Sequence, residues 1–330
     1  MLGRRIDLIC KPTPLHRLAN ASRDLGIDLW IKRDDLTGFA GGGNKGRKLE
    51  YLIADVLASG KRHVVTLGAT QSNFVRQCAA ACAVHGIEFH AVVMDWPYPD
   101  EARRTKPNVW PDTKMPSGNL LLDQWLGADV RRLPDATFDE LDAAARSLAE
   151  ELGAYFIPGG GSCGVGAMGF VSAAQELFGQ DPTVGTIMSA SGSGGTQTGL
   201  AYALAKWFPE KHYIGICTDD EPEMVNDFAA IASELDDLYG DPLHLTAEDF
   251  DLRIDYCGPG YGVPSEKATE AIKYLARAEG IFLDPVYTGK AFSGLIDLAG
   301  KGELSGRVVF WHTGGLPTLF ATGHLPVELH

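Results

Sequence analysis

The sequence of 330 residues contains no apolar run that could cross a membrane, because a membrane-spanning helix needs about 18 to 20 such residues in succession. Its first residues, MLGRRIDLICKPTPL, include basic side chains but no apolar stretch after them, so no signal peptide is predicted. Positive charge is also scarce, since 29 Lys and Arg face 43 Asp and Glu, for a formal net charge of −14. This acidic balance disfavours anionic partners, so neither nucleic acid nor a membrane is expected to bind.

Cysteine is sparse, and no histidine accompanies it at the spacing of a metal site. The six cysteines are Cys10, Cys78, Cys82, Cys163, Cys217 and Cys257. Cys78 and Cys82 share one face of a predicted helix, where two reduced core residues are the simplest interpretation. No metal site is predicted, and a reducing compartment is expected, most simply the cytoplasm.

Most of the chain alternates short β-branched runs with helical patterns. Strands are predicted over 63–69, 89–95, 128–133, 155–160, 183–191, 213–218 and 307–315, and helices over 72–86, 117–127, 138–153, 164–179 and from about 196. This alternation predicts an α/β fold whose parallel-rich sheets are flanked by helices. Ligands in such folds bind at the carboxyl ends of the strands, so the polar turns that follow the strands are the candidate sites.

The segment SGSGGTQTG (191–199) follows a predicted strand and opens a predicted helix. Small residues here, Ser193, Gly194, Gly195 and Thr196 among them, would let backbone N–H groups converge on an anion. The segment has no Gly-Lys-Ser/Thr ending, and no acidic residue follows at the distance that holds a ribose. It therefore favours a single phosphate over a nucleotide, with a ligand-free strand–helix turn as the alternative.

The segment AGGGNKGRKLE (40–50) places Lys45 directly after three glycines and Asn44. The glycines would allow a flat ring to approach the backbone, and Asn44 could hydrogen-bond a substituent on that ring. A nucleophilic lysine must be partly desolvated, so that its amine can be neutral near pH 7. By itself, Lys45 could be a solvated lysine in a turn. Combined with a single-phosphate turn and no nucleotide signature, it indicates pyridoxal 5'-phosphate (PLP), whose aldehyde forms a Schiff base with lysine.

Seven spaced motifs extend this interpretation over nearly the whole chain. They are PTPL (12–15), IKRDD (31–35), GGNKGRKLEYL (42–52), GATQSNFVRQ (68–77), GPGYGVP (258–264), DPVYTGKA (284–291) and HTGGLPTLF (312–320). Together they resemble the PLP-dependent family that joins D-cysteine desulfhydrase with 1-aminocyclopropane-1-carboxylate (ACC) deaminase. The resemblance implies the two-domain fold of the tryptophan-synthase-β type, a small amino-acid substrate and a homodimer. The expected domains are a large PLP-binding domain of residues 1–47 plus 161–330 and a small inserted domain of residues 48–160.

The resemblance also implies roles for residues in these motifs. Lys45 looks like the Schiff-base lysine, and Asn73 like the asparagine beside the ring hydroxyl of the cofactor. Gln71, Ser72 and Asn73 look like the turn that binds the substrate carboxylate, with Ser72 also placed for proton transfer. Because Ser72 precedes a predicted helix, it also fits an ordinary N-cap. Residues 193–196 match the phosphate loop.

Four further residues concern the substrate and the pyridine ring. Tyr261 and Tyr287 resemble the two tyrosines that face the substrate, although either could simply be packed. ACC deaminases place a glutamate beside the pyridine nitrogen where this sequence has Thr288. A neutral hydroxyl makes a weaker electron sink, which suffices for a substrate with a good leaving group on Cβ. Thr313 is likewise polar where ACC deaminases are apolar, and both positions look like the D-cysteine desulfhydrase type.

Two features leave the substrate open. Trp96 resembles the ACC deaminase side of the family, and Ser162, on another strand-end turn, is expected to line the substrate pocket. The segment 97–118 is rich in proline and carries Arg103 and Arg104. It is either a solvated surface loop or a lid whose cations meet a second anionic group, as on L-cysteate.

The sequence therefore predicts a PLP-dependent carbon–sulfur lyase that converts D-cysteine to pyruvate, ammonia and hydrogen sulfide. ACC deamination and L-cysteate sulfo-lyase activity are alternatives within the family. A PLP-binding protein without catalysis is the alternative from another class, against which the retained Lys45, Ser72, Tyr261 and Tyr287 argue.

Overall fold

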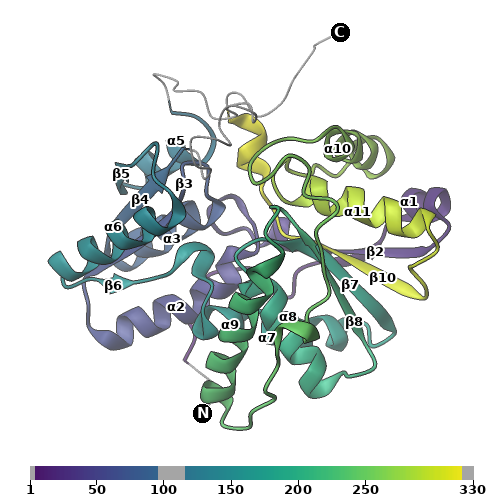
Figure 1. The fold of residues 1–330 in the computed structure, drawn as a ribbon, viewed down its shortest axis with the longest axis horizontal. Helices are drawn as coiled ribbons and strands as arrows, with labels where there is room; N and C mark the ends of the chain where they lie inside the picture. The colour runs from purple at the N-terminus through teal and green to yellow at the C-terminus, as the bar shows by residue number, and fades with distance from the viewer. Residues whose placement is uncertain (1–3, 96–115, 322–330) are drawn as a thin grey trace.

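The computed structural model describes residues 4–95 and 116–321, and these form two sheets flanked by helices. Figure 1 shows the strands of the smaller sheet on one side of the molecule and those of the larger sheet on the other. The predicted α/β architecture is confirmed. Among the described residues, no helix combines the length and the apolar character needed to span a membrane.

The larger sheet has six strands in the order β1-β2-β10-β7-β8-β9. Their bounds are β1 Leu15–Arg17, β2 Asp28–Arg33, β7 Val184–Ser191, β8 His212–Cys217, β9 Leu252–Arg253 and β10 Arg307–His312. All neighbours are parallel except β1, which runs antiparallel to β2. The central strands β7 and β10 are nearly continuously buried, as expected for a parallel sheet covered on both faces.

The smaller sheet has four parallel strands in the order β5-β4-β3-β6. Their bounds are β3 His63–Ala69, β4 Glu88–Met94, β5 Asp129–Arg132 and β6 Tyr155–Phe156. All four lie inside the segment 48–160. The predicted boundary at 47/48 falls within helix α2 (Lys45–Ser59), which packs on helices of both parts of the chain, so the division into two domains stays a prediction.

Helices cover both faces of each sheet. Besides α2 they are α1 Ala19–Leu25, α3 Asn73–His85, α5 Gly118–Trp125, α6 Phe138–Glu151, α7 Gly164–Gln180, α8 Gly195–Trp207, α9 Val225–Tyr239, α10 Glu266–Glu279 and α11 Thr288–Gly300. One apolar cluster joins α7, α8 and α9 to the larger sheet, and a second joins α1, α10 and α11 to its other face. Around the smaller sheet, α2 and α3 share one cluster and α6 contributes to another. Cys78 and Cys82 are buried free thiols in the α3 cluster, as predicted.

Helix α7 brings its neighbours close because glycines stand at the helix crossings. A Cβ on Gly169 would lie 2.3 Å from the Arg47 carbonyl oxygen of α2, and one on Gly199 of α8 would lie 2.4 Å from the Ala167 carbonyl oxygen of α7. Any side chain at either position would push the helices apart. The start of α2 and the start of α8 are thereby held on the same central helix.

The first turn of α2 is anchored by a buried ion network centred on Arg47. Its guanidinium donates to Asp34 through Nε and Nη2, both at 2.8 Å, and to Glu176 of α7 through Nη1 at 3.1 Å and Nη2 at 2.9 Å. Lys32 of β2 also donates to Glu176. Burial alone would raise the pKa of Glu176, but Arg47 and Lys32 hold it at about 2. The network fixes α2 against both β2 and α7.

Replacing Arg47 with Met should lower the free energy of unfolding by about 3–5 kcal/mol, because Asp34 is completely buried and would lose its charge partner. Urea unfolding followed by far-UV circular dichroism measures this. The matched control is Arg23→Met, whose ion pair with Asp24 is exposed and should contribute at most about 1 kcal/mol. Equal losses in the two variants would contradict the structural role of the network.

Candidate active site

Lys45 is the first residue of α2, at the end of a turn that only glycine can form. Gly41, Gly42 and Gly43 all have positive φ, and a Cβ on Gly42 would lie 1.9 Å from the Asp35 carbonyl oxygen. The next residue, Asn44, donates its backbone N–H to the Thr313 carbonyl oxygen at 2.9 Å and its Nδ2 to Thr196 Oγ1 at 3.1 Å. The lysine turn is therefore tied both to the end of β10 and to the start of α8.

The Lys45 side chain is half-buried, and burial lowers the pKa of its amine to about 8. Among the described residues, no carboxylate forms an ion pair with it. At pH 7, about a tenth of the Lys45 amine is therefore neutral, which is about 300-fold more than for a lysine of ordinary pKa. The amine is thus partly desolvated and partly neutral, which are the properties expected of a nucleophile.

The predicted phosphate loop connects β7 to α8, and its backbone leaves no room for a side chain at Gly194. Gly194 has a φ of +85°, and a Cβ on it would lie 2.2 Å from the Phe228 ring. The N–H groups of the first turn of a helix have no partners within that helix, and they add positive potential. The loop and the start of α8 therefore form an anion cradle.

Lys48 completes this cradle, and sequence reasoning missed it. It lies one turn after Lys45 and is 1% exposed, and its Nζ donates to the Gly160 carbonyl oxygen at 2.9 Å and to Ser162 Oγ at 3.3 Å. Burial and the neighbouring charge of Lys45 lower its pKa well below the ordinary value. A Cβ on Gly195 would lie 2.7 Å from its Nζ, so the amine stands directly beside the loop. The KxxK spacing in GGNKGRK was the available signal.

Ser162 lies at this same loop rather than beside the residues expected to hold a substrate carboxylate. Its hydroxyl accepts the Gly195 N–H at 3.3 Å and lies 2.8 Å from Ser193 Oγ. Because it also accepts from Lys48, its own hydrogen is directed to Ser193. These contacts favour a part in holding the loop over the predicted part in lining the substrate pocket.

The turn Gln71-Ser72-Asn73 begins helix α3. Ser72 is the N-cap, and its Oγ accepts the Val75 N–H at 3.2 Å, so the capping interpretation of Ser72 is confirmed. The side chain of Gln71 binds the start of α5, since its Oε1 accepts the Asn119 N–H at 2.8 Å and its Nε2 donates to the carbonyl oxygen of the N-cap Ser117 at 3.0 Å. Gln71 can therefore offer a substrate its backbone more readily than its side chain.

Arg76 is a second residue that sequence reasoning missed, and it links the Ser72 turn to the lysine turn. Its Nη1 donates to Asn73 Oδ1 at 2.9 Å, and its Nη2 donates to the Gly42 carbonyl oxygen at 3.0 Å. Burial lowers its pKa to about 10. The buried Asp123 is the nearest acid, and burial raises the pKa of its carboxyl to about 8. Arg76 thus sets the distance between the two turns from the interior.

Tyr261 and Tyr287 lie together, as expected of two residues facing one site. Their hydroxyls are hydrogen-bonded and their rings form an edge-on pair with centroids 5.9 Å apart. Burial raises the pKa of Tyr261 to about 12 and raises the pKa of Tyr287 well above its ordinary value, so both phenols are neutral at physiological pH. A Cβ on Gly192 would lie 3.5 Å from Tyr287, which places this ring against the phosphate loop.

The buried Lys290 supports the tyrosine pair. Its Nζ donates to the carbonyl oxygens of Gly260 at 2.6 Å and Thr218 at 3.1 Å. Burial lowers its pKa to about 8, the same value as for Lys45. Unlike Lys45, however, its amine is fully engaged by backbone carbonyls, which fixes the loop that carries Tyr261.

Thr288 starts helix α11 and is completely buried against Asp284. Its hydroxyl donates to Asp284 Oδ1 and accepts the Asp284 N–H, both at 2.7 Å. The single hydroxyl hydrogen is thus already used within the chain, so in this arrangement Thr288 has no hydrogen to donate to an unprotonated ring nitrogen. Thr313 contributes its carbonyl oxygen to Asn44, and the neighbouring His312 accepts the Gly314 N–H on Nδ1 at 3.2 Å. Trp96 and most of the segment 97–118 lie outside the described residues.

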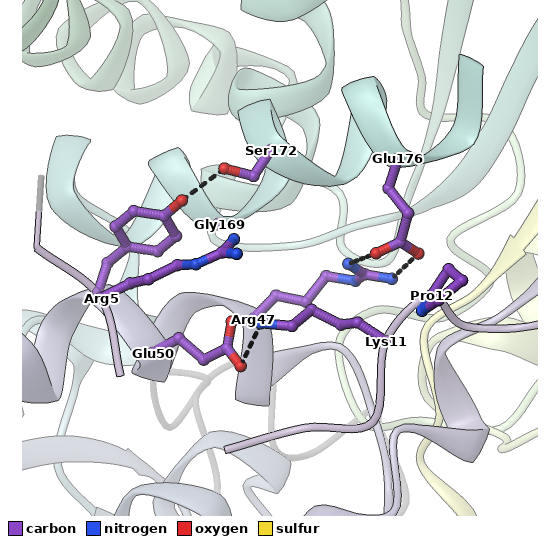
Figure 2. A pocket seen from close by; sticks show the side chains of 9 residues that line it. Arg5, Lys11, Pro12, Arg47, Glu50, Gly169, Ser172 and Glu176 are labelled. Atoms are coloured by element: carbon purple, nitrogen blue, oxygen red, sulfur yellow. Dashed lines mark hydrogen bonds and ion pairs between the residues drawn. The ribbon is translucent and has the colours of Figure 1, made fainter. Parts of the chain in front are cut away.

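A cavity of about 310 Å³ lies on the other side of α2 and is separate from this constellation. Figure 2 shows Arg47 and Glu50 of α2 facing Ser172 and Glu176 of α7 across it, with Arg5 at its edge. Positions 47, 50 and 51 share one face of a helix and positions 45 and 48 another. Because Glu176 and Asp34 already pair with Arg47, this cavity belongs to the interior ion network.

The residues present fit PLP. A monophosphate suits a glycine cradle with a buried ammonium beside it, since no carboxylate of the described residues pairs with Lys48. Ser191 Oγ at the end of β7 is buried and has no hydrogen-bond partner within residues 4–95 and 116–321, so a polar group is also left for a ligand. Lys45 directly follows Asn44, whose side chain donates to Thr196 at the start of α8.

Comparison with known proteins agrees with this fit. Residues 6–314 match the family described as "Pyridoxal-phosphate dependent enzyme". The chain in the crystal structure of an ACC deaminase homologue shares 36% sequence identity with this chain. The alignment covers 97% of this chain and 94% of the homologue, with a TM-score of 0.87.

More distant structures share the fold. A hydrogen sulfide-producing enzyme from Fusobacterium nucleatum is 17% identical, with 97% of this chain and 96% of that chain covered and a TM-score of 0.66. Maize serine racemase is 18% identical, with 92% and 88% covered and a TM-score of 0.64. The predicted family, fold and cofactor are therefore confirmed, and the chain belongs to the pyridoxal-phosphate dependent enzyme family.

Proposed function

We propose that the chain is a lyase that performs α,β-elimination on a small β-substituted amino acid, with D-cysteine as the first candidate. The overall reaction would be D-cysteine plus water giving pyruvate, ammonia and hydrogen sulfide. The observation that carries this proposal is a half-buried, partly neutral Lys45 amine beside an anion cradle. The residue before it, Asn44, is hydrogen-bonded to the Thr313 carbonyl oxygen. Bound PLP supplies the electron sink that stabilises negative charge at the substrate Cα.

In this proposal each residue acts through a property seen in the structure. Lys45 Nζ takes the α-proton, because its lowered pKa suits a base working near pH 7. Free N–H groups at the start of α3, beside Ser72, bind the substrate carboxylate and so fix which Cα–H bond faces Lys45. Lys48, Ser193, Gly194, Gly195 and Thr196 hold the phosphate, with Asn44 bracing Thr196.

The remaining predicted residues would shape the ring and substrate contacts. Tyr261 and Tyr287 are neutral phenols that lie together, so the pair would present hydroxyl groups to the substrate. Asn73 is held by Arg76 and Asn119, which orients its side chain beside the ring. Thr288 offers no carboxylate to protonate the ring nitrogen, which favours a substrate with a good leaving group. A homodimer and a cytoplasmic location stay predictions.

ACC deamination is the second candidate, favoured by the similarity to an ACC deaminase homologue over nearly the full length. It would release ammonia and 2-oxobutanoate. L-Cysteate is the third, and depends on the cationic segment 97–118, which falls largely outside the described residues. A non-catalytic PLP-binding protein is the contrasting case.

Substrate assays with the PLP-loaded protein separate these candidates. D-Cysteine should give sulfide and pyruvate in equal amounts, and ACC should give no product, because Thr288 is neutral and makes the weaker electron sink. Sulfite released from L-cysteate as the main product would instead favour the third candidate. The L-enantiomer of cysteine is the matched control for the carboxylate turn. If 2-oxobutanoate from ACC were the main product, the elimination proposal would be wrong. No turnover of any β-substituted amino acid would favour the non-catalytic case.

Lys45→Ala should abolish both the visible absorption band of bound PLP and all product formation. The matched control is Lys290→Met, which also removes a buried lysine whose pKa is about 8 but which donates to two backbone carbonyls. This control should keep the visible band. A band that survives Lys45→Ala and disappears in Lys290→Met would reassign the PLP lysine.

Lys48→Met should weaken PLP binding about 10- to 100-fold, since a hydrogen bond from a charged group contributes about 1.5–3 kcal/mol. The dissociation constant is measured by titrating the cofactor-free protein with PLP and following absorbance. Lys61→Met serves as the control, because Lys61 is exposed and its amine binds the Ala154 carbonyl oxygen. Unchanged affinity in a folded Lys48→Met variant would remove Lys48 from the phosphate site.

A further inference from the structure

Two histidines and a glutamate gather where strands β3 and β4 begin, at the edge of the smaller sheet opposite the Ser72 turn. His63 pairs in register with Glu88, and His90 lies two residues further along β4, so all three project from the same face. One ligand atom from each lies within 4.8 Å of the others. Strand β3 continues for six more residues before the Ser72 turn, which places the cluster about 20 Å from the candidate active site.

Two of the three distances between these ligand atoms match those around one metal ion. His63 Nδ1 lies 3.2 Å from His90 Nε2 and 3.6 Å from Glu88 Oε2. A tetrahedral ion bound at about 2.0–2.2 Å by nitrogen and oxygen ligands holds neighbouring ligand atoms roughly 3.3–3.6 Å apart. The side chains therefore need little rearrangement to bind an ion between them.

A carboxylate behind His90 prepares its ring to be a ligand. His90 pairs in register with Asp129 of β5, and its Nδ1 lies 2.9 Å from Asp129 Oδ2. A carboxylate can only accept, so Nδ1 carries the hydrogen and the Nε2 lone pair faces His63. Metal-binding histidines are oriented by such an outer carboxylate, which also increases their basicity.

Exposure and charge are compatible with binding from solvent. The exposed fractions of the side chains are 12% for His90, 29% for His63 and 70% for Glu88, so an ion has an entry path and water can complete its coordination. The carboxylates of Glu88 and Asp129 both favour a cation. Two cations oppose this charge nearby: Arg131, with its Nε 3.9 Å from Asp129 Oδ2, and Arg62, the residue before His63.

We propose that His63, Glu88 and His90 bind one divalent transition-metal ion of borderline softness, such as Zn²⁺, with Asp129 as the positioning residue. Two imidazoles and one carboxylate suit such an ion better than Mg²⁺ or Ca²⁺, which prefer oxygen ligands. The ion would clamp the start of β3 to β4. The sequence predicts no metal site, because His63 and His90 are 27 residues apart and only strand pairing unites them.

The test uses the PLP-loaded full-length protein, dialysed against a chelator and titrated with Zn²⁺ by calorimetry without any amino acid present. We expect saturable binding of about one ion per chain and none of Mg²⁺. His90→Ala should lose at least about tenfold in affinity, and Asp129→Asn should also weaken binding about tenfold or more. The matched control is His212→Ala, an exposed histidine at the start of β8, which should bind as the wild type does.

The variant Glu88→Gln tests whether weaker Zn²⁺ binding could come from misfolding, because the Glu88 side chain is mostly exposed and its replacement should not disturb the fold. It should keep the circular dichroism and PLP absorbance of the wild type yet bind Zn²⁺ more weakly. Co²⁺ spectra of the wild type should show nitrogen and oxygen ligands, without thiolate charge transfer from the exposed Cys10. The proposal is overturned by no saturable binding, by thiolate absorption, or by unchanged affinity in both His90→Ala and Glu88→Gln.

Discussion

The buried ion network of Arg47 is the interaction on which the arrangement of the candidate active site depends. It fixes the first turn of α2 to Asp34 after β2 and to Glu176 on α7. Lys45 precedes Arg47 by two residues and Lys48 follows it directly, so both lysines are oriented by the same anchor. One face of α2 is thus bound to the interior, which leaves the other to present two amines beside the α8 loop.

The candidate active site is electrostatically incomplete without an anionic ligand. Lys45 and Lys48 lie one turn apart with lowered pKa values, and neither pairs with a carboxylate of the described residues. One buried and one half-buried amine without a counter-ion destabilise the protein unless they lose protons or meet a phosphate. The same feature supplies a neutral nucleophile at Lys45 and an anion partner at Lys48. Binding of the cofactor should therefore also stabilise the fold.

The smaller sheet carries chemistry-bearing side chains at both ends of its strands. At the carboxyl end of β3, the Ser72 turn opens α3, and Arg76 ties it to Gly42. At the other end, His63 and His90 meet Glu88 in a solvent-accessible cluster. Parallel register produces both arrangements, since it brings all strand starts to one edge and all strand ends to the other.

Local patterns in the sequence predicted the strands β3–β8 and β10, the helices α3 and α5–α8, the glycine turn before Lys45, the Ser72 N-cap and the family, because each depends on residues close along the chain. They did not predict β1, β2 and β9, or the helices α1, α2 and α9–α11. Only the tertiary structure decided which side chains contact one another in the candidate active site and the histidine cluster. It placed Ser162 against the loop that precedes α8, bound the hydroxyl of Thr288 to Asp284, and buried Lys48 and Arg76 where they connect separate turns. It also paired His63 with His90. These contacts join residues far apart in sequence through strand register and helix crossings, which composition and periodicity do not encode.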